Sequence, residues 1–96
     1  MANDLRDVLI QREGYSLRSA EMTAADLSDI KDTDLSQALS RWLETGEKTN
    51  VSRGSFSCAG LMQSYKMKYP AALVFLDWYS EDPETAQAAL CFGGGE

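Results

Sequence analysis

The stretch SFSCAGLMQSYKMKYPAALVFLDW, Ser55 to Trp78, carries the clearest structural signal in this sequence. Ser55 or Ser57 can cap a first helix, because a serine hydroxyl accepts a hydrogen bond from the unpaired amides of a helix start. Residues 66–68 form a turn, and Pro70 suits the first position of a second helix, where its missing N–H would be unpaired anyway. The spacing predicts a helix-turn-helix.

The second of these helices, expected over residues 70–79, is apolar on nearly every side. Asp77 interrupts an otherwise apolar series, which consists of Ala71, Ala72, Leu73, Val74, Phe75, Leu76, Trp78 and Tyr79. A helix that packs against one neighbour needs only one apolar stripe. We therefore expect this helix to be either central in the fold or an interface. In the helix before it, we expect the apolar side chains to point inward, namely Leu61, Met62 and Tyr65.

Helical signals also precede this stretch. A helix is expected over about 4–13, with Asn3 as its cap and Gly14 as the left-handed residue that ends it. A better-marked helix begins at a cap on Asp32 or Thr33 and ends at Gly46. Its apolar residues fall on one face at the spacing of a helix, and they are Leu35, Ala38, Leu39, Trp42 and Leu43.

The segment between these helices lacks a clear period. We expect residues 15–22 to form a loop that packs Tyr15 and Leu17 onto the core. Thr23 followed by Asp26 resembles a capping box, so a short helical turn is expected to begin there. The sequence thus predicts less regular structure in this region than on either side of it.

A last helix is expected to begin at Asp82 and Pro83 and to run through about Leu90. The glycines that follow it predict a disordered tail over 93–96. Together these signals predict an all-α single domain over 1–96, a compact bundle of four to five short helices with a central helix-turn-helix and no wing hairpin.

Composition indicates a folded, soluble chain. Its 96 residues and 44% hydrophobic content suffice for one modest core. The sequence shows neither a signal-peptide pattern nor an apolar run long enough to span a membrane, so we expect a cytoplasmic protein with no membrane partner. Cys58 and Cys91 have no metal-ligand spacing and are expected to be reduced thiols in the core.

The net charge of −6 is unevenly distributed. Residues 48–76 contain no acid and four basic side chains, which are Lys48, Arg53, Lys66 and Lys68. Nucleic-acid binding requires clustered cations, so this zone is the one place where phosphate contacts are expected. A solvated surface that lacks carboxylates explains the same pattern.

Residues 57–77 resemble the helix-turn-helix of the DNA-translocase gamma-type winged-helix domains. The resemblance is carried by Leu61 and by the matching positions of YKMKYPAALVFLD, which are Tyr65, Lys66, Met67, Tyr69, Ala72, Phe75, Leu76 and Asp77. It implies a trihelical scaffold in which the second helix of the helix-turn-helix contacts DNA.

The sequence departs from that family where DNA would be read. Pro70, Ala71 and Val74 stand where polar and basic side chains would face the bases, and none of them can donate to a base edge. The segment EDPETAQAAL that follows is helical in pattern and acidic, so no wing hairpin is expected there. We therefore expect no direct base reading by this helix.

Catalytic motifs are missing from the sequence. It contains no histidine, no Gly-rich phosphate loop and no nucleophile elbow, and a lone thiol lacks the imidazole that most cysteine nucleophiles need. We expect no enzyme activity, no cofactor, no metal site and no small-molecule substrate.

Two function classes remain. The first is a protein-interaction or regulatory module that associates through helix 70–79, most simply with a second copy, using Val74, Trp78 and Tyr79 as exposed anchors. Burial of the aromatic side chains in the core is the structural alternative. The second class is a DNA-binding accessory protein of bacterial, phage or mobile-element type, with phosphate contacts from Arg53, Lys66 and Lys68.

Overall fold

The computed structural model describes residues 5–93, with side chains through Leu90. Within these residues the chain forms six helices and one short hairpin: α1 (Leu5–Glu13), α2 (Leu17–Ser28), α3 (Thr33–Thr45), β1 (Ser52–Arg53), β2 (Phe56–Ser57), α4 (Cys58–Ser64), α5 (Tyr69–Glu81) and α6 (Pro83–Gly93). The mainly helical class is confirmed. The finer prediction, purely all-α with four to five helices, was wrong. The expectations for Asn3, for the thiol of Cys91 and for residues 94–96 lie outside the described residues.

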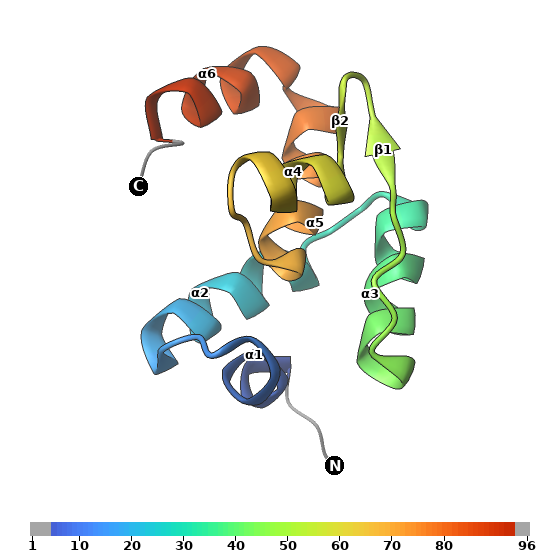
Figure 1. Cartoon of the computed structure of the whole chain (residues 1–96), viewed down its shortest axis with the longest axis vertical. Coiled ribbons are helices and arrows are strands. Elements are labelled where there is room, and N and C mark those ends of the chain that lie inside the picture. The colour runs from blue at the N-terminus through green and yellow to red at the C-terminus, as the bar shows by residue number, and fades with distance from the viewer. Residues whose placement is uncertain (1–4, 94–96) are drawn as a thin grey trace.

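Helix α5 is the centre of the fold (Figure 1). It packs against α2, α3, α4, α6 and both strands. Its inward side chains include Tyr69, Leu73 and Leu76, which are completely buried, and Trp42 of α3 packs against Tyr69 with ring centroids 6.0 Å apart. Each such buried side chain contributes on the order of 1.5–3 kcal/mol to folding. Most of the apolar surface of α5 is therefore used inside this chain.

Residues 15–22, predicted to be a loop, mostly belong to α2. Ser16 caps this helix, because its hydroxyl oxygen accepts a hydrogen bond from the Ser19 amide at 3.2 Å. The predicted cap at Thr23 instead lies inside the helix. The N-terminal region is thus a pair of packed helices, α1 and α2.

The apolar side chains of α2 explain why its sequence lacks a clear period. Ala20 and Leu27 face the core, whereas Leu17 is 59% exposed and Met22 is also exposed. Exposed apolar residues blur the periodicity from which a helix is predicted. The expectation that Leu17 packs onto the core was wrong, and the same expectation for Tyr15 is confirmed.

Helix α3 follows the prediction at both ends. The Asp32 carboxylate accepts hydrogen bonds from the first amides of the helix, and Gly46 ends it with a φ of 80°. Arg12 of α1 adds a contact that spacing could not reveal. Its Nη1 and Nη2 donate to the carbonyl oxygens of Trp42 and Leu43 at 2.5 and 3.0 Å. A cation at the negative end of α3 ties α1 to it.

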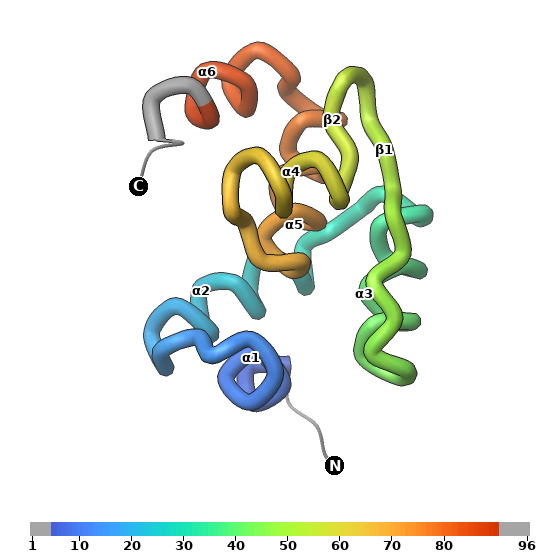
Figure 2. The backbone as a smooth tube through the Cα atoms, viewed as in Figure 1, coloured from blue at the N-terminus to red at the C-terminus, as the bar shows by residue number. Residues whose placement is uncertain are grey.

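A two-stranded antiparallel hairpin precedes α4. Ser52 pairs with Ser57 and Arg53 pairs with Phe56 around a two-residue turn. Strands of two residues are too short to show the alternation from which a strand is predicted. The chain reaches this hairpin from the end of α3 by running back alongside that helix (Figure 2). The hairpin stands before the helix-turn-helix, whereas a wing would follow it, and the described residues after α5 form α6.

The connection between α4 and α5 has the predicted location. Lys66 adopts a φ of 59°, the left-handed conformation that commonly ends a helix. The amides of Tyr65 and Met67 donate to the Leu61 carbonyl at 3.0 and 3.5 Å. Leu61 is buried as predicted, but Tyr65 is 39% exposed, so its inward placement was wrong. The turn therefore directs Tyr65 toward solvent.

Candidate protein interface

Trp78 is the exposed aromatic side chain of α5. It borders a hollow of about 560 Å³ between the end of α2, the segment that joins α2 to α3, and the outer side of α5. The residues that line the hollow, here called the Trp78 surface, are Asp26, Asp29, Lys31, Val74, Asp77, Trp78 and Glu81. Two regions distant in sequence, residues 26–31 and residues 74–81, thus meet at one place.

Trp78 and Val74 form the apolar part of this surface. They are four residues apart and therefore neighbours on one face of α5. Trp78 is 38% exposed and Val74 is half-buried. The described side chains place cations over aromatic rings at Trp42 and Tyr15, so the indole of Trp78 is not covered by a cation from them.

The rim of the Trp78 surface is acidic. Four of its seven residues are carboxylates and one is a lysine. The Asp77 carboxylate faces inward, where Oδ1 accepts hydrogen bonds from the amides of Lys31 and Asp32, both at 3.3 Å. Lys31 Nζ lies 3.9 Å from a Glu81 carboxylate oxygen, and both side chains are more than half exposed, so this pair is weak.

Tyr79, the third predicted interface residue, lies elsewhere. Its ring packs against Phe56 and Phe75 with centroid distances of 5.1 and 6.1 Å. Its hydroxyl lies beside Gly54 at the hairpin turn. The structure therefore brings Val74 and Trp78 together and assigns Tyr79 to the packing between α5 and the hairpin.

Arg53, one of three predicted phosphate ligands, is already paired. Its Nη2 lies 2.7 Å from Asp32 Oδ1, its Nε lies 3.1 Å from Asp32 Oδ2, and its Nη2 also lies 3.2 Å from Asp34 Oδ2. The hydrogen bonds that Arg53 donates hold the pKa of Asp32 below its usual value, and the same bonds raise the pKa of Arg53. The guanidinium thus joins the hairpin to the start of α3.

Lys66 and Lys68, the other two, lie at the opposite end of α5. They precede its first residue, whereas Arg53 adjoins Gly54, which contacts Tyr79 near its last turn. Ten residues of helix separate Tyr69 from Tyr79, a distance of roughly 15 Å. Lys68 also places its ammonium 5.8 Å from the centroid of the Tyr15 ring. The three predicted cations do not form one patch.

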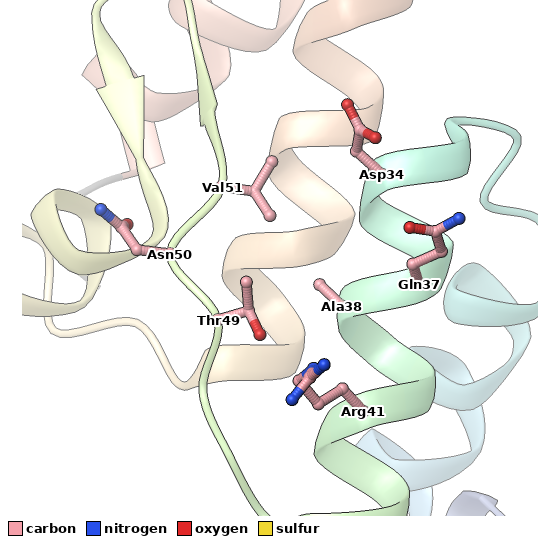
Figure 3. Close-up of a pocket in the computed structure, with 7 residues that line it drawn as sticks. All are labelled: Asp34, Gln37, Ala38, Arg41, Thr49, Asn50 and Val51. Atoms are coloured by element: carbon pink, nitrogen blue, oxygen red, sulfur yellow. The ribbon is translucent and has the colours of Figure 1, made fainter.

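A second hollow, of about 340 Å³, lies between α3 and the extended segment that precedes β1 (Figure 3). Its charged side chains already have partners, since Asp34 contacts Arg53 and Arg41 Nη1 lies 3.0 Å from Glu47 Oε1. Asn50 points away from α3 in this view, and its side-chain oxygen accepts from the Ala59 amide. Thr49 Oγ1 is buried there without a hydrogen-bond partner. The lining of this hollow contains no aromatic side chain, in contrast to the Trp78 surface.

The surroundings of the Cys58 thiol are those of a side chain packed in the core. Cys58 is buried in the first turn of α4, and burial raises the pKa of its thiol. Among the described residues, no cluster of three potential metal ligands occurs. In the same part of the chain, every helix is too short or too polar to cross a membrane.

Val74 and Trp78 were predicted as interface residues from the sequence, whereas Asp26 and Asp29 beside them were not. Asp26 and Asp29 lie at the end of α2, a helix whose extent the sequence did not reveal. Their approach to Trp78 depends on the packing of α2 against α5. The cluster of acids around residues 26–34 was the available signal, but it did not point to α5.

Comparison with known proteins found no match, whether to family models, to curated proteins or to solved structures.

Proposed function

We propose that this protein is a small interaction module that binds a protein partner at the Trp78 surface. The observation that supports the proposal is the exposure of a tryptophan on the central helix of the fold, beside a hollow of about 560 Å³. Tryptophan is among the residues that contribute most binding energy at protein interfaces. An indole left at the surface of a small domain is therefore the first place to seek a partner.

Self-association through the same helix is a narrower form of this proposal. A symmetric dimer centred on Trp78 would bring the acidic rim of one copy against that of the other, because a twofold interface uses the same patch on both subunits. Like charges brought together in an interface cost free energy. The rim thus favours a partner of different composition over a second copy.

Nucleic-acid binding has less support. Arg53 is engaged by two carboxylates, and Lys66 and Lys68 lie at the other end of α5. Phosphate binding depends on clustered cations. The DNA-binding alternative would have to rest on Lys66 and Lys68 without Arg53.

Site-specific photo-crosslinking in the cells that make the protein tests the proposal. A photoreactive phenylalanine analogue at position 78 is expected to give a discrete protein adduct, whereas the same analogue at exposed Ser40 of α3 is not. Light scattering over a range of concentrations separates an adduct with a second copy from one with another protein. Equal crosslinking from positions 78 and 40 would contradict the proposal.

A further inference from the structure

The charges around Trp78 indicate the chemistry of its partner. We propose that the Trp78 surface binds a basic protein segment, with a Lys or Arg side chain against the exposed indole and neighbouring cations near Asp26, Asp29 and Glu81. This inference rests on the proposed function and specifies its partner. It concerns a macromolecular segment with several positive charges rather than a single small cation.

The indole of Trp78 shares its hollow with four carboxylates. A cation over a tryptophan face is attracted by the ring, and nearby carboxylates add to that attraction. Trp78 is exposed, and none of the cation–ring contacts among the described side chains involves it. The site therefore combines two features that each favour a guanidinium or ammonium group.

Some of the carboxylates around Trp78 remain available to a partner. Asp77 is occupied by the amides of Lys31 and Asp32, but Asp26 and Asp29 are exposed, and the ion pairs among the described residues do not involve them. Glu81 has only a long contact to Lys31. Unpaired rim charges increase the rate of association with a partner of opposite charge.

Other kinds of partner fit the Trp78 surface less well. Phosphate-bearing partners such as nucleic acid or an anionic membrane would meet the acidic rim and be repelled. Val74 and Trp78 are the apolar residues that line the hollow. An amphipathic helix that docks in a groove needs a longer apolar surface than these two residues provide. A basic segment is the occupant that uses both the indole and the rim.

Calorimetric titration of the full chain with a synthetic peptide composed of Lys, Leu and Gly tests the proposal. We expect binding that weakens as salt is added, and amide shifts in the NMR spectrum that are confined to the end of α2 and to α5. A peptide with Glu in place of every Lys is expected not to bind. Equal binding of the two peptides, or shifts centred on other elements, would overturn the proposal.

Substitutions within the protein separate local recognition from general attraction to an acidic chain. The pair Asp26→Lys and Asp29→Lys is expected to weaken peptide binding about tenfold. The matched pair Glu44→Lys and Glu47→Lys changes the net charge equally at exposed positions away from the hollow, and about a threefold loss at most is expected. Equal losses from the two pairs would show unspecific attraction and overturn the proposal.

Substitutions of Trp78 measure how much the indole contributes to peptide affinity. Trp78→Ala is expected to weaken peptide binding about tenfold, and Trp78→Phe, which keeps a ring, by less than about threefold. Lys31→Ala removes the one cation of the rim and is expected to strengthen binding by about twofold. Unchanged affinity in the Trp78→Ala protein would overturn the proposal.

Binding of a protein partner at the Trp78 surface and the basic character of that partner can be tested separately. A crosslink from position 78 to a partner without a basic segment would support the proposed interaction function and would overturn the proposal that the partner is basic. Equal crosslinking from positions 78 and 40 would contradict the module itself.

Discussion

The guanidinium of Arg53 and the carboxylate of Asp32 form a two-pronged ion pair, with Nη2–Oδ1 at 2.7 Å and Nε–Oδ2 at 3.1 Å. The same carboxylate caps α3, and the Asp32 amide donates to Asp77 of α5. Three elements, the hairpin, α3 and α5, are therefore joined through one residue. Asp32 and Arg53 are 19% and 26% exposed at their side chains, which leaves the pair only partly accessible to water.

Asp32→Asn is expected to lower the free energy of unfolding by about 1–2 kcal/mol. Asparagine is as good a helix cap as aspartate, so this change keeps the cap and removes the charge that Arg53 pairs with. Urea unfolding of Asp32→Asn, Arg53→Met and the double variant measures the coupling between the two residues. Additive losses would show that the ion pair contributes nothing to stability.

The same pair gives stability a specific pH dependence. Its hydrogen bonds lower the pKa of folded Asp32 below the value of about 3.9 for an unfolded chain. The stabilisation is therefore fully present above pH about 4 and is lost as pH falls through the folded pKa. The stability difference between the native protein and Asp32→Asn is expected to be constant from pH 7 to about pH 5 and to shrink as the pH falls below about 4. A difference that does not shrink there would contradict the assignment.

Arg12→Met is expected to destabilise the protein by about 1–2 kcal/mol. The substitution keeps much of the apolar stem but removes both hydrogen bonds to the last turn of α3 and the contact of the guanidinium with the Trp42 ring, 5.3 Å from its centroid. Arg18→Met on the exposed side of α2 is the control, with an expected change within about 0.5 kcal/mol. Similar losses for the two variants in thermal unfolding would contradict the role of Arg12.

Gly54→Ala is expected to cost more than Gly46→Ala. Both glycines have positive φ, 58° and 80°, so each substitution carries a backbone cost of about 1 kcal/mol. Only at Gly54 would the added Cβ also approach Tyr79, at 2.7 Å from its hydroxyl oxygen. In a Tyr79→Ala background the excess cost at Gly54 is expected to disappear, and urea unfolding of the four combinations measures it. If the excess cost of Gly54→Ala persisted in the Tyr79→Ala background, it would come from the turn and not from the contact with Tyr79.

Lys66→Gly is expected to stabilise the protein by about 0.5–1 kcal/mol. Lys66 has a φ of 59°, which disfavours any side chain, and glycine relieves that cost. Lys66→Ala removes the same charge without relieving the backbone, so its stability should stay near that of the native protein. Equal gains from the two variants would point to charge rather than conformation.

The sequence predicted those elements whose signals are local. The caps at Asp32 and Gly46 and the turn before Pro70 each depend on a residue with a particular backbone preference, and all three lie where expected. The hairpin was missed because its strands are two residues long. The first part of helix α2 was missed because Leu17 and Met22 are exposed on it, whereas a helical turn after Thr23 was predicted.

The candidate interface was only partly predictable for a different reason. Trp78 and Tyr79 are adjacent in the sequence, and helical geometry alone turns them about 100° apart. Which of them faces solvent depends on where the hairpin packs, and Tyr79 is covered by Phe56. The same limit applies to Arg53, whose pairing with Asp32 spans 21 positions.

The place of α5 in the chain has a consequence for biosynthesis. The helix that α2, α3, α4 and both strands pack against begins only at Tyr69, so a growing chain exposes their apolar faces until that helix has been made. At roughly 5–20 residues per second, translation from Thr45 to Glu81 takes a few seconds. Until Tyr69 has been made, the ring of Trp42 lacks the aromatic side chain against which it packs in the folded protein.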